Sequence, residues 1–498
     1  MCKNKFILSK EACTAEQYIK ELHGAAGSIP DAELLAALEE VTAKRIEEIR
    51  NTKTNVEISG KSYYVSGMGD DENDGLTPET AWRTMQKVSE ADLLPGDGVF
   101  FRRGELFRGH MQTKSGITYS AYGEGIKPRL YGSAKNAALV SLWKETDVPY
   151  VWEYAEPCEL DIGCIVFDCK SWARKIYRSA RYEDGKCYDY KTKAVFEDYH
   201  DLVEDMSFFQ DMQEKKLYLR CERGNPGALA GEIEMSERMP VISNGRNCDV
   251  TVDNLCLGFS SFGVASSTTK NLTVKNCEIY WIGGNIQNDV KEGEERKYPI
   301  PYGNGIEIYG GAENFTVDNC YIWQNYDAAM TNQCGSGGAG VSYNNIRYTN
   351  NVMEYCVYSV EIFLGPSETE ERYNNNTFVE NNIMRKAGGF GQHQRIDPDC
   401  TAHIRNGRII SNTNNYIVRN NIMDRSERRI VRTLLHDVND GGNKAQYFDN
   451  LYVQKRGMQF CERLGKVYYM SENIGDELED THTEHNSKYI VTEEFTDI

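Results

Sequence analysis

Three acidic residues in the middle of the chain stand in segments that mix polar and apolar residues: Glu307, Asp327 and Glu361. Hydrolysis of a glycosidic bond requires two carboxylates, one to protonate the leaving oxygen and one to act as nucleophile or base. We expect Asp327 and Glu361 to be this catalytic pair. Glu361 lies in an apolar phrase, where burial should raise its pKa and suit it as the acid, whereas Asp327 lies among polar residues and should stay ionised.

Other polar and aromatic residues near these acids are predicted to bind the substrate. They are Glu307, Asn332, Gln333, Gln392, His393, Arg395, Trp323 and Tyr326. His393 and Arg395 would bind sugar hydroxyls or a carboxylate, and the rings would offer stacking faces to a sugar. Glu307 and Asp397 also remain candidates for the second carboxylate.

The same residues have a purely structural interpretation, which the sequence leaves open. Asp327 would then cap a turn, and Glu361 would pair with Arg395 or Arg432. Trp323 and Tyr326 would pack in the core.

Two candidate metal sites depart from known ligand patterns. His393, Asp397, Asp399 and His403 match no strong zinc spacing. Residues 70–75 resemble a calcium loop, but the twelfth position is Ala81, where an EF-hand requires glutamate. We therefore predict no cofactor and no metal. Structural calcium in this loop is the alternative to a solvated turn whose side chains bond their own backbone.

A short phrase built on asparagine recurs through the second half of the chain and must position these residues. Its asparagines are Asn254, Asn276, Asn319, Asn350, Asn381, Asn420 and Asn450, at intervals of 22, 43, 31, 31, 39 and 30 residues. Such intervals are typical of a parallel β-helix, in which each coil contributes three short strands. The 43-residue interval is predicted to hide an extra coil near residues 305–308.

Stacked coils place equivalent residues one strand spacing apart, about 4.8 Å. We expect the repeated asparagines to point inward and to pair their amides along the stack, which would satisfy a buried polar group in each coil. The position after each of them should lie in register as well. Cys277 and Cys320 occupy that position and are therefore predicted to be core residues.

Counting from these asparagines predicts which residues share one outer face. Asp327, Glu361, Gln392 and Arg432 lie 8, 11, 11 and 12 residues after Asn319, Asn350, Asn381 and Asn420. Consecutive coils present such positions side by side, so one rim should carry all four. The two predicted catalytic carboxyls would then be roughly 5–10 Å apart, which leaves a retaining or an inverting outcome open.

Residues 14–50 are predicted to be helical, because residues 14–17 fit a capping box and apolar residues recur at helical spacing from Leu34 to Ile49. We expect residues 1–55 to form a cap over one open end of the solenoid, with partner binding as the alternative. Residues 56–498 should form the β-helix. Short strands at 135–240 predict a small β-sandwich-like insertion.

Residues 61–133 carry a family resemblance. The phrases are YYVS at 63–66, DGLTPETAW at 74–82, LPGDGVFF at 94–101 and GELFRG at 104–109. This pattern resembles the opening of many bacterial right-handed parallel β-helix proteins of carbohydrate metabolism. The resemblance implies the first coils of that fold and is nearly silent on substrate.

A second phrase, residues 360–366, is similar to the acid-bearing strand of β-helix β-xylosidases, which also carry a β-sandwich-like insertion. The resemblance implies that Glu361 is the acid. In that family the nucleophilic aspartate lies on the preceding coil, and the matching place here is near Asn332. Because an amide cannot be that nucleophile, this sequence departs from the family, and Asp327 is expected to take the role.

Composition bounds the partners and the location. The net charge of −19 should repel nucleic acid and acidic membrane surfaces, and it disfavours a polyanionic substrate unless a local basic groove overrides it.

The apolar run at residues 6–8 is too short for a signal peptide, and no stretch approaches the roughly 20 apolar residues of a membrane span. Fifteen cysteines without a CxxC pair indicate reduced thiols, so we predict a cytoplasmic protein. Prior removal of a leader is left open.

Together these features predict an all-β, right-handed parallel β-helix that hydrolyses an oligosaccharide or glycoside. Two other functions stay open. One is a polysaccharide lyase or uronate epimerase, for which Arg395, Arg432 or Lys386 would be candidate bases. The other is a non-catalytic glycan-binding solenoid. The sequence does not specify the sugar, the linkage or the oligomeric state.

Overall fold

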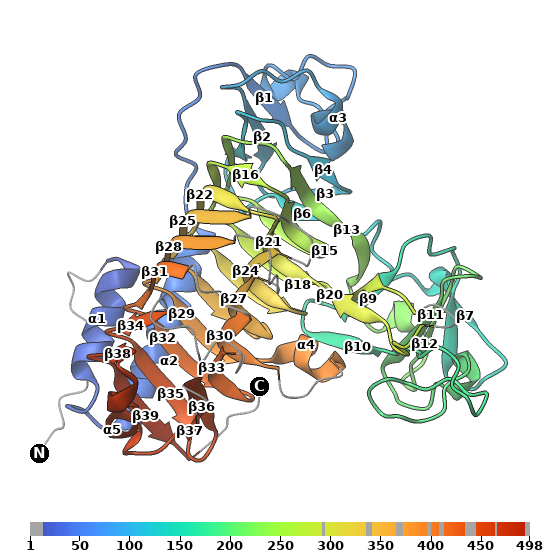
Figure 1. Cartoon of the computed structure of the whole chain (residues 1–498). Helices are drawn as coiled ribbons and strands as arrows, with labels where there is room; N and C mark the ends of the chain where they lie inside the picture. Colours follow the sequence, from blue (N-terminus) through green and yellow to red (C-terminus); the bar gives the residue numbers. More distant parts are fainter. Residues whose placement is uncertain are drawn as a thin grey trace, which may run out of the picture.

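The computed structural model describes residues 13–290, 294–334, 341–364, 372–395, 400–407, 413–433, 445–463 and 466–493. Parallel strands dominate it (Figure 1). One coil consists of β22 (Ala312–Asp318), β23 (Tyr321–Asn325) and β24 (Ala328–Cys334). These strands pair in parallel with β25 (Ser342–Thr349), β26 (Val352–Glu354) and β27 (Tyr358–Leu364) of the next coil. Pairing of each strand with the third strand that follows it is the topology of a parallel β-helix, so the predicted class is confirmed.

Three stacked sheets run along the solenoid. The first contains β22, β25 and β1 (Ser62–Val65), β2 (Gly98–Arg102), β5 (Thr118–Tyr122), β14 (Val250–Asp253), β17 (Leu272–Lys275), β28 (Tyr373–Glu380), β31 (Thr413–Arg419), β34 (Gln446–Phe448) and β38 (Glu484–His485). The second contains β23, β26 and β3 (Leu106–Arg108), β6 (Arg129–Tyr131), the first part of β15 (Cys256–Ser266), β18 (Glu278–Ile282), β29 (Ile383–Ala387), β32 (Ile422–Ser426), β35 (Leu451–Lys455) and β39 (Lys488–Thr492).

The third sheet positions the predicted site. It contains β24, β27 and β4 (Met111–Gln112), β13 (Ile233–Gly245), the second part of β15, β21 (Asn304–Tyr309), β30 (Ala402–Gly407), β33 (Arg429–Thr433) and β36 (Gln459–Arg463). Its inward side chains, among them Ile306, Met330, Val360 and Ile404, join the main apolar core. Side chains alternate along a strand, so their immediate neighbours face outward.

The predicted extra coil near residues 305–308 is wrong. The strand β18 pairs directly with β23, and β17 pairs with β22, so residues 276 and 319 belong to adjacent coils. The additional residues include an antiparallel hairpin of β19 (Asn285–Asn288) and β20 (Ile300–Tyr302), and β21 completes the coil. An insertion within one coil lengthens the interval between Asn276 and Asn319 without adding a coil to the stack.

The repeated asparagines mostly form turns rather than an inward row. Asn276, Asn319, Asn350 and Asn381 have φ values of 54°, 52°, 59° and 59°, in the left-handed region that asparagine tolerates. They are only half-buried. They bend the chain between the first and second sheets, and the predicted inward orientation is wrong for these positions.

The inward ladder is formed by the position after the turn. Asn351, Asn382 and Asn421 each donate from Nδ2 to Oδ1 of the next member, at 3.0 Å, and the ladder ends at Asn450. All four are completely buried. Cys277 and Cys320 continue the row in the earlier coils, where both belong to the apolar core, which confirms their predicted place. Asn450 therefore belongs to the ladder and not to the turn series, whose member in that coil is Asp449.

Two helices cover the side of the solenoid rather than an end. The apolar faces of α1 (Ala15–Ala25) and α2 (Asp31–Arg50) pack on one row of outward residues of the second sheet. The row runs from β23 to β39 and consists of Tyr321, Val352, Ile383, Ile422, Leu451 and Ile490. Figure 1 shows the pair lying beside these strands. The predicted end cap is thus misplaced, because a row of outward apolar residues on the second sheet provides a longer surface than one coil end. At the ends, α3 (Met85–Glu90) and α5 (Ile474–Leu478) contribute side chains to the main core.

Between β6 and β13 the chain leaves the stack. It forms β7 (Trp143–Glu145), β8 (Val151–Tyr154), β9 (Ile162–Phe167), β10 (Ser171–Lys175), β11 (Ser207–Asp211) and β12 (Lys216–Arg220). These strands are joined mainly by antiparallel pairing and enclose a separate apolar cluster. The boundaries 135–240 and the β-sandwich form stay predictions. None of the helices in the described ranges has the length and apolar character of a transmembrane segment.

The inward ladder predicts a position-specific loss of stability. Asn382→Ala removes an amide that donates to Tyr348 O and Asn421 Oδ1 and accepts from Asn351. Leaving these buried groups unpaired should cost about 2–4 kcal/mol, seen as a lower urea midpoint. The control is Asn414→Ala, whose exposed amide donates to Asn375 and should change stability by less than about 1 kcal/mol. Equal losses in both variants would contradict a structural role of the ladder.

Candidate active site

One row of outward side chains crosses the third sheet. Strand register aligns Glu307 with Thr331, Thr331 with Glu361, Glu361 with Arg405 and Arg405 with Arg432. These five residues come from β21, β24, β27, β30 and β33. The stack therefore brings two carboxylates and two guanidinium groups, separated by up to 125 residues in sequence, into a single line.

Glu361 is the most enclosed acid of this row, with 1% of its surface exposed. Its Oε2 accepts hydrogen bonds from Thr331 Oγ1 at 3.2 Å and Gln333 Nε2 at 2.8 Å. Its Oε1 pairs with Arg405 Nη1. Burial raises the pKa of Glu361, and the Arg405 charge opposes that rise. Because Arg405 is largely shielded from solvent, loss of the Glu361 charge would leave a guanidinium without its counter-ion.

Glu307 has no cation partner among the residues that the structure describes. Its Oε2 accepts a hydrogen bond from Asn304 Nδ2 at 2.6 Å, and its side chain is only half-buried. Loss of solvation raises the pKa of Glu307 to about 7, and the charges of Glu361 and Asp327 add to the rise. Near neutral pH this carboxyl therefore holds a proton in a substantial part of the molecules.

Asp327 stands outside the row. It precedes β24 by one residue and lies four residues before Thr331, which corresponds to roughly 13 Å along a strand. Its Oδ1 lies 2.9 Å from Arg395 Nη1, and both side chains are mostly enclosed. Arg395 also lies over the rings of Tyr326 and Tyr358. Asp327 is thus the counter-ion of Arg395, which follows the short helix α4 (Gly389–Gln394).

A pocket of about 250 Å³ adjoins this ion pair. Tyr326, Arg395, Tyr190 and Tyr298 are among the residues that line it. The rings of Tyr190 and Tyr298 are stacked with centroids 3.7 Å apart. An aromatic pair facing a guanidinium provides both a stacking surface and hydrogen-bond donors, which are the groups that a sugar ring contacts.

Comparisons with known proteins give partial likenesses. No protein-family model matches the sequence. A lacto-N-biosidase of Bifidobacterium longum subsp. longum is 36% identical over 100 residues, which cover 18% of this chain and 6% of that protein. The chain thus spans only a small fraction of the curated relative that it matches.

Solved structures are similar over most of the chain at low identity. A structure of XylC with xylose has a TM-score of 0.45 and 11% identity, covering 87% of this chain and 86% of that one. A structure described as a glycoside hydrolase has a TM-score of 0.49 and 10% identity, covering 86% and 97%. Glycoside hydrolases and lyases both occur among the similar structures.

The structure brings some of the predicted site residues together. Glu307, Gln333 and Glu361 gather in and beside the outward row, and Asp327, Arg395 and Tyr326 form the neighbouring ion-pair cluster. Asn332 does not belong to either group. It is completely buried inside the solenoid, where its Oδ1 accepts a hydrogen bond from Tyr348. The prediction that Asn332 binds substrate is wrong, because alternation along β24 turns it inward.

Gln392 and His393 do not share the rim with Glu361. They lie in α4, where Gln392 is buried and His393 is exposed beside Trp172 of the insertion. The residue in register with Glu361 on the next coil is Arg405. Counting eleven residues from Asn381 failed because α4 lengthens this coil. The alternation of Ala402–Gly407 is the signal in the sequence that would have pointed to Arg405.

Trp323 also lies elsewhere. It stands on the outer face of the second sheet, stacked on Tyr280 with ring centroids 4.9 Å apart, and its Nε1 donates to Glu278. In the structural interpretation of the sequence, Glu361 was expected to pair with Arg395 or Arg432. The partner is instead Arg405, while Arg432 approaches the Tyr358 hydroxyl at 3.5 Å.

The candidate metal residues do not converge in the described part of the chain. His403 is buried, with ring nitrogens beside Ser359 Oγ and Arg425 O, and Asp397 and Asp399 lie outside the described residues. No group of three metal-ligating side chains occurs among the residues described. In the loop at 70–75, Asp71 accepts hydrogen bonds from Arg83 and Thr84, as in a turn that satisfies its own carboxylates.

The Glu307 environment predicts a pH dependence of stability. The folded state keeps a proton on Glu307 up to about pH 7, whereas an unfolded chain releases it near its ordinary pKa of about 4.3. Stability should therefore fall as pH rises through this interval, by at most about 1.4 kcal/mol per pH unit for this group. Glu427 and Glu484, whose pKa values also rise to about 7, contribute in the same direction.

The measurement is the difference between wild type and Glu307→Gln. Urea unfolding at pH 5, 6, 7 and 8 should show that the variant loses less stability across this range. The exposed ion-paired Glu313 supplies the control, Glu313→Gln, which should follow the wild-type profile. Parallel profiles for all three proteins would contradict a raised pKa at Glu307.

Proposed function

We propose that this protein is a glycoside hydrolase in which Glu307 is the general acid and Glu361 is the general base. The observation that carries the proposal is the outward row of the third sheet, where one carboxyl has a pKa of about 7 and the other is paired with a cation. An acid and a base whose environments differ in this way are the groups required for hydrolysis of a glycosidic bond.

Glu361 was the acid predicted from the sequence, with Asp327 as its ionised partner; the proposal moves the acid role to Glu307, gives Glu361 the role of base, and leaves Asp327 out of the pair. Asp327 is held by Arg395 at 2.9 Å and starts roughly four residues from the row. In the described part of the chain Glu307 has no cation partner, and the charge of Glu361 raises its pKa more than that of Asp327 does. Glu307 can donate its proton to the leaving-group oxygen and is then left as a carboxylate. Asp327 instead keeps Arg395 in place at the adjoining pocket.

Glu361 is proposed to activate water. Burial raises the pKa of Glu361, while Arg405 and the hydrogen bonds from Thr331 and Gln333 oppose that rise and favour the ionised form. A carboxylate held on several sides cannot rotate freely, so its orientation toward a water molecule is preset. The proposed chemistry uses carboxylates alone and needs no cofactor.

The strand count between the two acids favours inversion. Glu307 and Glu361 are two strand spacings apart, since β24 lies between their strands, which puts their backbones about 9.5 Å apart. Inverting glycosidases need roughly 6.5–9.5 Å between carboxyls to admit water, whereas retaining enzymes need about 5–5.5 Å. We therefore expect the first-formed product to have the opposite anomeric configuration, as observed by NMR during early turnover. Retention of configuration would rule out this pairing.

Substitution of either acid should abolish hydrolysis. Glu307→Gln and Glu361→Gln each remove one proton-transfer group and should lower kcat by about 10²–10⁴ on the glycosides that wild type cleaves from a broad panel. Glu313→Gln, on the first sheet, should keep wild-type kcat. The wild-type rate should also fall above pH 7, where Glu307 loses its proton. Unchanged kcat in both variants would reject the assignment.

Two other functions have distinct readouts. A lyase would release an unsaturated product that absorbs in the ultraviolet. The candidate base for that reaction is Tyr358, which lies close to Arg395, Arg405 and Arg432. Burial raises the pKa of Tyr358, which opposes its use as a base at neutral pH. A glycan-binding solenoid would show affinity for a saccharide without turnover.

A further inference from the structure

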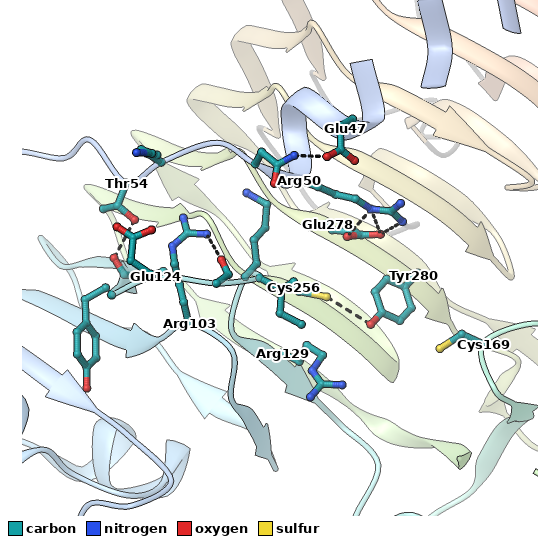
Figure 2. Close-up of a pocket in the computed structure, with 18 of the residues that line it drawn as sticks. Glu47, Arg50, Thr54, Arg103, Glu124, Arg129, Cys169, Cys256, Glu278 and Tyr280 are labelled. Carbon is teal, nitrogen blue, oxygen red and sulfur yellow. Dashed lines mark hydrogen bonds and ion pairs between the residues drawn. The ribbon is translucent and has the colours of Figure 1, made fainter. Parts of the chain in front are cut away.

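A second groove lies on another face of the solenoid. It has a volume of about 1150 Å³ and stands where the α2 helix ends and leaves the outer face of the second sheet uncovered. Arg129, Cys256 and Glu278 occupy one register row there, and in the following coils α1 and α2 cover the continuation of that row. Figure 2 shows side chains from α2, the early coils and the β9–β10 turn arranged around this space.

The groove is locally basic in a strongly acidic protein. Six basic residues line it: Arg50, Lys53, Arg103, Lys127, Arg129 and Lys170. The four acidic lining residues are Glu47, Glu124, Asp168 and Glu278. Three of these acids already have partners within the protein, since Arg50 binds Glu278, Asn51 binds Glu47, and backbone amides bind Asp168. Only Glu278 is neutralised by an ion pair, with Arg50, and the six basic side chains outnumber the four acidic ones.

Arg129 and Lys127 form no direct ion pair in the described part of the chain, although Glu232 and Asp253 are near enough to interact with them electrostatically. Arg129 forms no ion pair there, and its Nε is buried without a hydrogen-bond acceptor. Lys127 is 4% exposed, and its ammonium donates only to Asn254 Oδ1. The nearby acid Asp253 is bound by Ser120 and Asn276 instead. Buried charge without a counter-ion is unfavourable, so an external anion would be stabilised here.

Aromatic residues complete the groove. Tyr280 and Trp323 both line it and are stacked on each other. Their orientation is fixed by a hydrogen bond between the Tyr280 and Tyr131 hydroxyls and by one that Trp323 Nε1 donates to Glu278. A rigid aromatic surface beside guanidinium groups is suited to a ligand that has both a ring face and a negative charge.

We propose that this groove binds an acidic oligosaccharide, with Arg129 and Lys127 contacting a sugar carboxylate and Trp323 contacting a sugar ring. The volume exceeds the roughly 300–1,000 Å³ of a small-molecule site and accommodates several sugar units. Guanidinium and carboxylate groups pair in a bidentate geometry, which favours a carboxylated sugar over a neutral one. The groove is a binding site on the second sheet, separate from the acids of the third sheet.

The test is isothermal titration calorimetry of the whole chain with a galacturonate tetrasaccharide and a neutral galactose tetrasaccharide. The acidic saccharide should bind and weaken with added salt, and the neutral one should bind at least about tenfold more weakly. Arg129→Gln should weaken acidic-saccharide binding by about tenfold or more. Binding is measured without turnover, so the result does not depend on the proposed hydrolase function.

Two further variants keep the test decisive. Lys53→Gln/Lys170→Gln removes two exposed charges of the rim and should weaken binding even if Arg129→Gln fails to fold. Arg419→Gln removes an exposed charge of the first sheet, paired with Glu380, and should leave the affinity unchanged. Wild-type affinity in both groove variants, equal binding of the neutral saccharide, or tighter Arg129-dependent binding of single-stranded RNA would each overturn the proposal.

Discussion

The buried amide ladder sets the register on which the rest of the solenoid depends. Asn351, Asn382, Asn421 and Asn450 each pair with a neighbour above or below, and a shift of one residue would break every one of these hydrogen bonds. Such a slip would also turn each strand's apolar side chains outward. The left-handed turns that precede the ladder hold the chain direction between the first and second sheets. Turn and ladder together specify where each coil begins.

The candidate site is a consequence of that register. Glu307 and Glu361 face the same side because the number of strands between them, and not the number of residues, places them in one row. Thr331 separates the two acids, and Arg405 follows Glu361 on the next strand. This order lets one carboxyl gain a counter-ion while the other keeps its proton. Reversal of Thr331 and Arg405 in the row would instead give Glu307 a cation and lower its pKa.

The sequence predicted the repeat well and the site only in part. Intervals near 31 residues identified the coils, because an undecorated coil has a nearly constant length. Counting failed where a coil carries an additional element, as at the β19–β20 hairpin and at α4, since residue number measures chain length and not position in the stack. Asn332 was misplaced for a related reason: a polar residue on a strand can face the interior when a buried partner such as Tyr348 satisfies it. Glu361, within a regular strand, was placed correctly on the outer face.

Net charge is a weaker guide to ligands than the local arrangement of charges. A total of −19 disfavours anions on average, but charges separated by more than about 8 Å are largely screened at physiological ionic strength. In the groove beside α2, three of the four acids are bound within the protein, and Lys127 and Arg129 form no ion pair among the described residues. The third sheet shows the converse for Arg395 and Arg405, which are paired with Asp327 and Glu361. Pairing on each sheet therefore decides which charges remain available to a ligand, and the second and third sheets differ in this respect.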